Sequence, residues 1–144
     1  MTLTTTAKSA AIAILVLTSA PAFAGGNIVD ITQFGWGNGI GGAQTGNWNQ
    51  MTVFQNGHAQ TSLSTQDGND NLVVIGQSGS HSTATTAQSG DCNISGIAQF
   101  GVGHSASTDQ NGDCNAVAVI QGGSGNSASA HQVGTGNISV IVQN

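Results

Sequence analysis

The stretch QSGDCNISGIAQFGVGH (residues 88–104) contains the pattern Gln-x-Gly twice, with the two glutamines eleven residues apart. The same spacing continues in both directions along the chain without a slip. The glutamines of this series are Gln33, Gln44, Gln55, Gln66, Gln77, Gln88, Gln99, Gln110, Gln121, Gln132 and Gln143. Glycines follow two residues behind them at Gly35, Gly46, Gly57, Gly68, Gly79, Gly90, Gly101, Gly112, Gly123 and Gly134. Chance does not keep a register over eleven copies, so this is a repeat protein.

A third recurring position lies five residues after each glutamine and holds an amide or another polar residue. Its members are Asn38, Asn49, Gln60, Asn71, Ser82, Asn93, His104, Asn115, Asn126 and Asn137, and Asn27 holds the same phase before the first glutamine. Each unit therefore has a seven-residue segment, from the asparagine position to the glutamine, and a four-residue link of the form x-Gly-x-x.

The first 24 residues lie outside the repeat and have the features of a secretory signal peptide. Lys8 precedes the apolar run AAIAILVLTSA (residues 10–20), and Ala22-Phe23-Ala24 matches an A-x-A cleavage signal. The run is too short to anchor the chain across a bilayer. We therefore expect residues 1–24 to be removed and residues 25–144 to be secreted as one repeat domain.

The charged residues of this domain are carboxylates. The chain has six aspartates and a single lysine, and that lysine is in the predicted signal peptide. A surface without basic residues is a poor partner for nucleic acid or anionic membranes, so we predict neither nucleic-acid binding nor membrane insertion. Lys, Arg, Glu and Tyr are absent from residues 25–144, while serines, aspartates and four histidines are present. No strand-to-helix nucleophile elbow accompanies them, so we predict no enzyme activity and no cofactor.

Two other classes share parts of this composition. Low charge with many Gly, Ser, Asn and Gln residues is typical of disorder, but a disordered tract has no reason to keep a register. An eleven-residue repeat is also typical of right-handed coiled coils. A glycine in every unit would cost such a helix about 1 kcal/mol each, so we reject the helix.

Strands and turns fit the repeat much better. The segments are rich in Val, Ile, Thr and Ser, as in NLVVIGQ (71–77), NAVAVIQ (115–121) and NISVIVQ (137–143). Glycine in each link supplies the positive φ of a tight corner. We expect eleven strands, one for each segment from residue 27 to residue 143.

A second period of 22 residues lies over the first. The odd segments carry mainly large apolar residues two and four places after their asparagine, at Val29/Ile31, Met51/Val53, Val73/Ile75, Ser95/Ile97, Val117/Val119 and Ser139/Ile141. The even segments mostly carry small residues there, at Ile40/Gly42, Ser62/Ser64, Ala84/Thr86, Ala106/Thr108 and Ala128/Ala130. Alternate side chains share one face of a strand, and large residues facing small ones fill a thin core.

These patterns predict an all-β, amyloid-like β-solenoid of about five and a half coils. Each 22-residue coil has two strand–turn units, and stacked coils form two parallel sheets packed face to face, with strands about 4.8 Å apart. The asparagines and glutamines share the inward face, so stacking would place each amide on its copy in an axial ladder. The other interpretation is that these amides are solvated at the surface.

The repeats resemble those of curlins, the bacterial amyloid subunits of curli fibres. The shared pattern is best seen in NAVAVIQGGSGNSASAHQ (115–132), and NISGIAQFGVGHSASTDQ (93–110) departs from it at His104, where asparagine is usual. The resemblance covers residues 25–144. It departs from the major curlins at Asn27, Asn49 and Asn71, where they usually have serine, and only Gly25 and Gly26 stand in place of their Gly-rich export segment.

This resemblance implies a subunit that crosses the outer membrane unfolded through the curli secretion machinery. It implies further that a nucleator curlin starts growth and that the subunits form a homopolymer, an adhesive biofilm fibre at the cell surface. The near-uniform repeats favour the major subunit, and the minor nucleating curlin is the alternative within the family.

Cys92 and Cys114 occupy matching GDCN corners, 22 residues apart. In stacked coils their Cα atoms would lie about 4.8 Å apart, within the range that disulfides use, and an exported chain meets oxidising conditions. Parallel Cβ vectors oppose good S–S geometry, so both a disulfide and a pair of stacked thiols remain open.

His58, His81 and His104 are 23 residues apart and would follow one corner of successive coils. Such a row could bind Zn²⁺ or Cu²⁺. Because the drift of one position per coil turns neighbouring side chains in different directions, we interpret them as polar corner residues and predict no metal site. His131 is expected on an outer strand face.

The outward faces of the two kinds of strand differ. Odd strands would present apolar residues, at Leu72/Val74, Ile94, Ala116/Ala118/Ile120 and Ile138/Val140/Val142. Even strands would present hydroxyl rows, at Thr61, Thr83/Thr85, Ser105/Ser107 and Ser127/Ser129, interrupted by Leu63 and by Gly39/Gly41. Hydroxyl rows on a solenoid are similar to some antifreeze proteins, so ice binding is a rival function.

Overall fold

The computed structural model describes residues 2–7 and 25–144. The predicted signal peptide therefore lies mostly outside the described residues, which include only its segment 2–7. Within the described part, no helix is long and apolar enough to cross a membrane.

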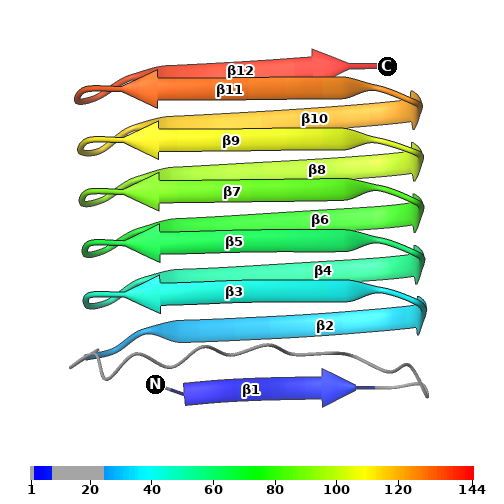
Figure 1. Ribbon diagram of the computed structural model, residues 1–144, viewed down its shortest axis with the longest axis horizontal. Helices are drawn as coiled ribbons and strands as arrows, with labels where there is room; N and C mark the ends of the chain where they lie inside the picture. Colours follow the sequence, from blue (N-terminus) through cyan, green and yellow to red (C-terminus); the bar gives the residue numbers. More distant parts are fainter. Residues whose placement is uncertain (1, 8–24) are drawn as a thin grey trace.

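Twelve strands lie in the part of the chain that the structure describes (Figure 1). The first sheet, sheet A, has the order β1-β2-β4-β6-β8-β10-β12. Its strands are β1 (Thr2–Ala7), β2 (Ile28–Trp36), β4 (Gln50–His58), β6 (Leu72–Ser80), β8 (Ile94–Val102), β10 (Ala116–Ser124) and β12 (Ile138–Gln143). The second, sheet B, has the order β11-β9-β7-β5-β3. Its strands are β3 (Gly39–Thr45), β5 (Thr61–Asp67), β7 (Thr83–Ser89), β9 (Ser105–Asn111) and β11 (Ser127–Val133).

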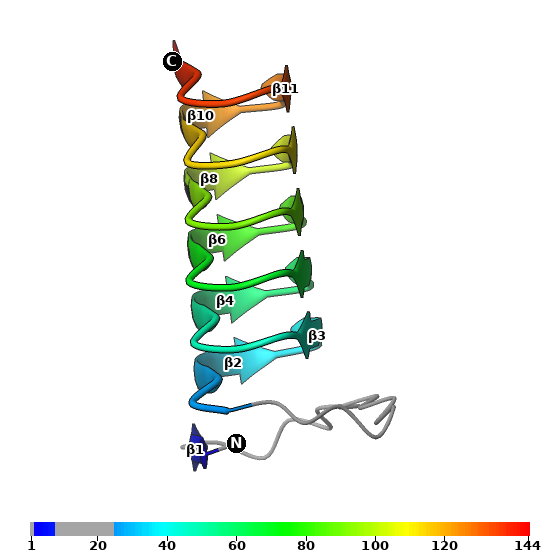
Figure 2. The same ribbon diagram turned by 90° about the vertical axis from the view of Figure 1, so that its left-hand side faces the viewer.

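The chain winds between the two sheets as a solenoid, one strand in each sheet per coil. From β2 onward, every ladder is parallel and joins residues 22 apart, as Gln77 to Gln99 in sheet A and Gln88 to Gln110 in sheet B. Figure 2 shows the two sheets facing each other along the whole stack. The predicted fold class, an all-β solenoid of 22-residue coils with two parallel sheets, is confirmed.

The strand boundaries differ from the predicted seven-residue segments. Strands begin one residue after the asparagine position. The backbone N–H of that position donates to the side-chain oxygen of the preceding coil's asparagine, as Asn93 N–H does to Asn71 Oδ1, and not to a backbone carbonyl. In sheet A, β2 to β10 have nine residues and continue through the glycine of the link. In sheet B the strands have seven residues and end just before that glycine. The ladder therefore extends further into the corner after a sheet A strand than into the corner after a sheet B strand.

The corner glycines are required by stacking as well as by torsion. Gly35 has φ 103°, and a Cβ atom on it would lie 1.7 Å from the carbonyl oxygen of Gly57 in the next coil. The close approach of successive corners therefore excludes every side chain at this position.

A second left-handed position directly precedes the asparagine position of each unit, and it was not predicted from the sequence. Glycine occupies it at Gly26, Gly37, Gly103, Gly125 and Gly136, while Trp48, Ala59, Asp70, His81, Cys92 and Cys114 adopt positive φ there. The recurrence of glycine two places after the link glycine was the available signal. A non-glycine residue in this conformation costs roughly 1–2 kcal/mol, which the surrounding ladder must offset.

The core is a thin layer between the sheets in which large side chains meet small ones. Val73, Ile75 and Val119 from sheet A are at most 1% exposed, and Ala84 and Ala106 from sheet B are similarly enclosed. Gly42 lies against Met51, whose sulfur would be 2.8 Å from a Cβ atom at that position. Large residues from one sheet therefore use the space that small residues leave in the other.

The strand β1 was not expected. It pairs in parallel with β2, in the register that joins Thr2 to Ile28 and Ala7 to Gln33. The sequence analysis had predicted a signal peptide for this segment and a first strand at Asn27. The free edge of β2 offers unpaired N–H and C=O groups to any extended chain, and residues 2–7 take that place in the full-length chain.

Candidate assembly interface

The glutamines form two axial ladders, one in each sheet. In sheet A each Nε2 donates to the Oε1 of the glutamine one coil further on: Gln33 to Gln55, Gln55 to Gln77, Gln77 to Gln99, Gln99 to Gln121 and Gln121 to Gln143, at 2.7–2.9 Å. In sheet B the donors and acceptors are Gln44 to Gln66, Gln66 to Gln88, Gln88 to Gln110 and Gln110 to Gln132, at 2.7–3.1 Å. Every one of these bonds points toward the C-terminal coil.

The same glutamines also hold the two sheets together. The second Nε2 proton of Gln77 is donated to the carbonyl oxygen of Thr61 across the core, at 3.2 Å, and that of Gln99 to Thr83, at 3.0 Å. The mid-stack glutamines are almost fully buried, with Gln55, Gln99 and Gln121 at 0% exposure. They are therefore internal amides with satisfied hydrogen bonds and not solvated surface groups.

The asparagines of sheet A form a ladder of a different kind. Each Oδ1 accepts from the backbone N–H one coil further on, as Asn71 Oδ1 does from Asn93 at 2.9 Å. The Asn93 Nδ2 group donates to the carbonyl oxygen of Gly112 in the following corner, at 2.7 Å. The members of this ladder are Asn27, Asn49, Asn71, Asn93, Asn115 and Asn137. Each asparagine therefore ties its corner to the next one.

In sheet B the corresponding positions are mixed. Asn38, Gln60, Ser82, His104 and Asn126 follow one another up the stack, and all but Asn126 are at most 4% exposed. Gln60 Oε1 has no hydrogen-bond partner among the described residues. Gln60 therefore keeps the backbone register of the asparagine position, but its side-chain oxygen lacks the hydrogen bond that an asparagine Oδ1 accepts there.

His104 replaces asparagine through both ring nitrogens. Its Nε2 lies 3.1 Å from the carbonyl oxygen of Phe100, and its Nδ1 accepts from the backbone N–H of Asn126 at 3.3 Å. Asn49 makes the equivalent bond to the carbonyl of Thr45, four residues before it. Because Nδ1 must accept, the geometry selects the neutral imidazole with its proton on Nε2.

This placement corrects the predicted row of corner histidines. His104 is 1% exposed and faces the core, whereas His58 and His81 lie at the surface with ring centroids 5.4 Å apart. His58 stacks on Trp36 at 5.0 Å. The drift of one residue per coil carries the third histidine inward. His131 lies on the outer face of β11, where its Nδ1 is 3.1 Å from Asp109 Oδ2.

Hydroxyl groups inside the core form bonds that the sequence analysis did not identify. Ser95 and Thr108 lie 2.8 Å apart, Thr108 donates to Thr86 at 3.1 Å, and Ser62 donates to Gln77 Oε1 at 2.9 Å. The sequence had placed these residues inward only as small side chains. Their partners are a hydroxyl of the other sheet, a hydroxyl of the same sheet and a ladder glutamine, whereas the buried Ser64 hydroxyl has no partner among the described residues.

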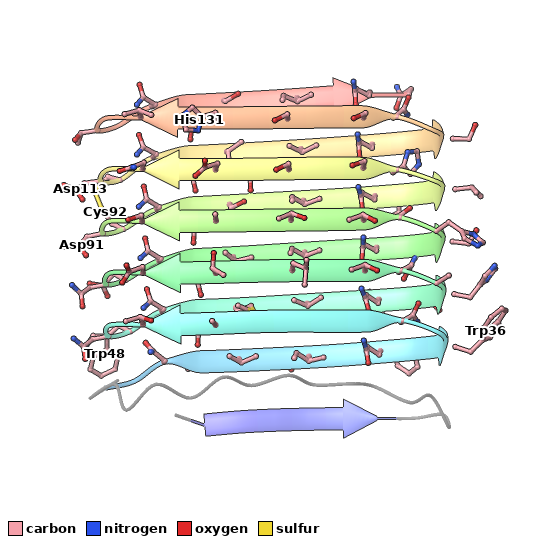
Figure 3. The ribbon with its side chains drawn as sticks, viewed as in Figure 1. Trp36, Trp48, Asp91, Cys92, Asp113 and His131 are labelled. Atoms are coloured by element: carbon pink, nitrogen blue, oxygen red, sulfur yellow. A yellow bond between two sulfur atoms is a disulfide. The ribbon has the colours of Figure 1, made fainter. Side chains whose placement is uncertain are left out.

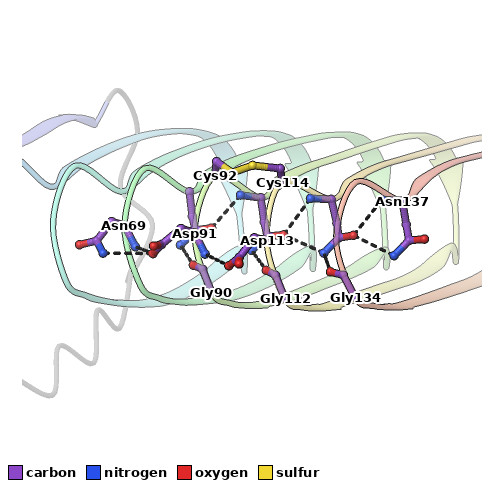
Figure 4. Close-up of a disulfide and its surroundings, with 12 residues drawn as sticks. Asn69, Gly90, Asp91, Cys92, Gly112, Asp113, Cys114, Gly134 and Asn137 are labelled. Carbon is purple, nitrogen blue, oxygen red and sulfur yellow. Dashed lines mark hydrogen bonds between the residues drawn. A yellow bond between two sulfur atoms is a disulfide. The ribbon is translucent and has the colours of Figure 1, made fainter.

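The corner before β8 and β10 contains a disulfide between Cys92 and Cys114, with a Cα–Cα distance of 4.5 Å (Figure 4). Beside it runs a row of short polar side chains from successive coils. Asn69 Nδ2 and its backbone N–H both donate to Asp91 Oδ1, and the Asp91 N–H donates to Asp113 Oδ1 at 3.1 Å. The disulfide thus joins neighbouring coils covalently, at a corner where each carboxylate or amide already bonds to the next coil.

The outer faces of the sheets carry different side chains, and successive coils place them in columns (Figure 3). On sheet A the columns include Leu72, Ile94, Ala116 and Ile138, then Val74, Ala118 and Val140, then Ile120 and Val142. Six of these, Ile94, Val74, Ile120, Ile138, Val140 and Val142, are 42–79% exposed. We call all the outward residues of these three columns the apolar stripe. On sheet B, Thr61, Thr83, Ser105 and Ser127 form one column and Leu63 interrupts the next.

The two ends of the stack present complementary groups. β12 and β11 are the last strands of sheets A and B, and there Gln143 Nε2 donates only to Ser127 O among the described residues. At the other end, β3 is the first strand of sheet B. The Oε1 atom of its Gln44 is buried and has no partner among the described residues. One end therefore offers an amide donor and the other an amide acceptor.

Comparisons with protein-family models, curated proteins and solved structures gave no match for this chain.

Proposed function

We propose that the chain is a secreted structural subunit that assembles into extracellular fibres of the curli type, for adhesion and biofilm matrix. The observation that carries this proposal is the stacking of like on like: glutamine on glutamine in both sheets, and asparagine on asparagine in sheet A, in register through successive coils. This is cross-β geometry within a single chain.

A second copy can pack on the end of such a stack through the same contacts that join one coil to the next. The outermost coil presents the same row of backbone groups, inward amides and small core residues that each internal coil presents to its neighbour. Each added backbone hydrogen bond would contribute about 0.5–1.5 kcal/mol net, and the buried amides would gain their missing partners. Polymerisation therefore uses the contacts that already fold the subunit.

The sequence features that resemble curlin repeats support the same function, since the residues that carry the resemblance are the ones in the ladders. On this proposal the exported chain reaches the surface through a curli-type secretion machinery, and a nucleating curlin starts its polymerisation. The minor nucleating subunit remains the alternative role, and incubation with and without fibre seeds separates the two.

The test is to purify residues 25–144 and incubate them at micromolar concentration. We expect fibres with an axial diffraction spacing of about 4.7 Å and an equatorial spacing of about 10 Å. A chain that stays monomeric for days, with neither spacing, contradicts the proposal.

Ice binding remains a second candidate because the hydroxyl column of Thr61, Thr83, Ser105 and Ser127 runs unbroken from β5 to β11 on the outer face of sheet B, although Gly39 takes its place on β3. Thermal hysteresis measured on monomer, without fibre growth, would favour it over the fibre proposal.

A further inference from the structure

The solenoid β2–β12 has unequal sheets. β2, β4, β6, β8, β10 and β12 lie in sheet A, whereas β3, β5, β7, β9 and β11 lie in sheet B. The top of the stack is therefore a step: β12 stands half a coil above β11. The bottom is also a step, because β2 begins half a coil below β3.

A second copy can meet this step in two ways. In the aligned joint its β2 lies on β12, so that sheet A is continuous, and one strand position in sheet B stays empty. In the half-turn joint the second copy is rotated by about half a turn around the fibre axis. Its β2 then lies on β11 and its β3 on β12, and both sheets continue without a gap.

We infer that copies of this solenoid join by the half-turn joint, so that sheet A of one copy continues as sheet B of the next. This inference rests on the proposed function, because it concerns the geometry of the fibre. An empty strand position would leave the N–H and C=O groups of two strands unpaired at every aligned joint, and buried backbone groups are rarely left so.

The corners of odd and even units differ in the length of strand they continue, nine residues in sheet A and seven in sheet B, but they share their left-handed positions. Gly35, which follows β2's glutamine, has φ 103°, and Gly134, which follows that of β11, has φ 110°. The second left-handed position shows the same match, with φ 69° at Gly37 and 72° at Gly136. A unit from sheet A can therefore lie on a unit from sheet B with its turns in register.

The amides favour the same joint. In the half-turn register Gln143 Nε2 of one copy faces Gln44 Oε1 of the next, and Gln132 Nε2 faces Gln33 Oε1. The first of these acceptors is the buried atom that has no partner among the described residues. In the aligned joint Gln44 would face the empty strand position and would stay unpaired.

The asparagine positions are also complementary. Within the stack, an asparagine Oδ1 accepts from the backbone N–H of the next coil, as Asn115 Oδ1 does from Asn137. At a half-turn joint Asn137 Oδ1 would accept from the Asn38 N–H of the next copy. Asn126 Oδ1 would accept from its Asn27 N–H. The joint thus repeats internal bonds without a new type of contact.

The core residues at the joint mix large and small within single strands. β12 contributes Ser139 and Ile141, and β3 contributes Ile40 and Gly42. Because facing strands run in opposite directions, Ile31 of the incoming β2 would meet Ser139 and Ile40. Its Val29 would meet Ile141 and Gly42 in the same way. Each large residue therefore has one small neighbour, as in the interior of the stack.

The structure also shows that the required edge of β2 accepts a strand. In the full-length chain β1 lies there, parallel and in register over Thr2–Ala7. In the half-turn joint the preceding copy's β11 takes this position, once residues 1–24 have been removed.

The two joints differ in rise per subunit. With strands about 4.8 Å apart, five and a half coils give a rise of about 26 Å, and the aligned joint, with its empty position, gives about 29 Å. Helical reconstruction of fibres grown from residues 25–144 measures this rise and the rotation directly. We expect about 26 Å and a rotation near half a turn, to which the twist of the solenoid adds.

Cross-linking gives a matched pair of variants. Val142→Cys with Ala43→Cys places two thiols on paired strands only in the half-turn joint, and Val142→Cys with Thr32→Cys does so only in the aligned joint. All three positions point outward, and Cys92 and Cys114 show that residues of successive coils in this stack can be bridged, at a Cα–Cα distance of 4.5 Å. We expect oxidised fibres of the first variant to dissolve in denaturant as covalent multimers, and those of the second as monomers.

The outcomes separate this inference from the proposed function. Fibres with the longer rise, or multimers from the Thr32 variant alone, overturn the half-turn joint and leave the fibre function standing. Failure of the unsubstituted chain to form fibres overturns both. If a cysteine variant does not assemble, the rise measured on the unsubstituted fibre still decides between the joints.

Discussion

At the scale of single residues, amides hold this core together in columns. Gln77 accepts from Gln55 and Ser62 and donates to Gln99 and to the carbonyl of Thr61. Its four bonds follow the axis and cross the core, so the side chain fixes both the stacking of coils and the spacing of sheets.

Replacing Gln77 by leucine should therefore slow fibre elongation and weaken the fibre. The substitution leaves buried donors and acceptors without partners, at roughly 1–3 kcal/mol for each one that water cannot reach, and puts a branched side chain into a thin core. Seeded elongation rates and the denaturant concentration that dissolves the fibre measure the effect.

Thr83→Ser is the matched control, since Thr83 points outward and is exposed. It should elongate at nearly the rate of the unsubstituted chain. Equal rates for the two variants would show that the inward assignment of the glutamines does not control growth.

The residue scale also shows how far sequence reasoning reaches. An eleven-residue phase is enough to place Gln77 on the inward face, because side chains alternate along a strand. The same phase puts His104 at an asparagine position, although its spacing from His58 and His81 predicted a ring at the corner with theirs. Only the position of Phe100 O and the Asn126 N–H reveals that an imidazole can make the bonds of an asparagine.

At the scale of the strand, the outer faces of the two sheets differ in wetting. The apolar stripe on sheet A extends from β6 to β12. Its column of Leu72, Ile94, Ala116 and Ile138 is unbroken, whereas Gly96 interrupts the column of Val74, Ala118 and Val140. Polymerisation would lengthen the stripe beyond the apolar patches that monomers usually expose, and such patches mark contact surfaces.

We expect fibres of the variant Val74→Thr, Ala118→Thr and Val140→Thr to grow normally but to bundle less. Threonine keeps the strand propensity and removes apolar area. Turbidity and negative-stain images of fibre width measure bundling. Sodium chloride at moderate concentration should not dissolve the bundles of the unsubstituted fibre, because apolar contacts, unlike ion pairs, are not screened by salt. Unchanged bundling in the variant, or bundles lost in salt, would contradict this account.

Strand bounds were harder to predict than strand faces. Alternation fixes which residues share a face, but the extension of β6 through Gly79 depends on how the next coil's backbone approaches that corner. A Cβ atom on Gly79 would lie 1.9 Å from the carbonyl oxygen of Gly101. Such a contact joins residues 22 apart and leaves no local trace in the sequence beyond the glycine itself.

At the scale of the whole molecule, the Cys92–Cys114 disulfide closes a loop of one coil, with a sequence separation of 22. A loop of that length restricts the unfolded chain by about 3 kcal/mol on the chain-entropy account. We expect fibres of the Cys92→Ser, Cys114→Ser variant to dissolve at a lower guanidinium concentration than oxidised fibres. Reductant should lower the midpoint of the unsubstituted fibre to that of the variant and leave the variant unchanged. Equal midpoints for oxidised fibre and variant would show that the bond adds no stability.

The architecture as a whole could be predicted from the two periods, since eleven and 22 residues set the strand and the coil. The ends could not be predicted in the same way. The repeat predicts no strand before residue 27, whereas β1 pairs with β2 through backbone groups that any sequence can supply. Periodicity describes the interior of a stack, and an end is by definition where the period stops.

The direction of the glutamine ladders has an electrical consequence. An amide group carries a dipole of about 3.5 D, and those of parallel strands largely cancel because successive backbone carbonyls alternate. The glutamine side chains do not alternate: every Nε2 points toward the C-terminal coil and every Oε1 away from it. Their moments add along the axis, as peptide moments do in a helix. A filament of such subunits would turn in a pulsed electric field and turn back when the field is reversed, whereas two filaments bundled in opposite directions would not.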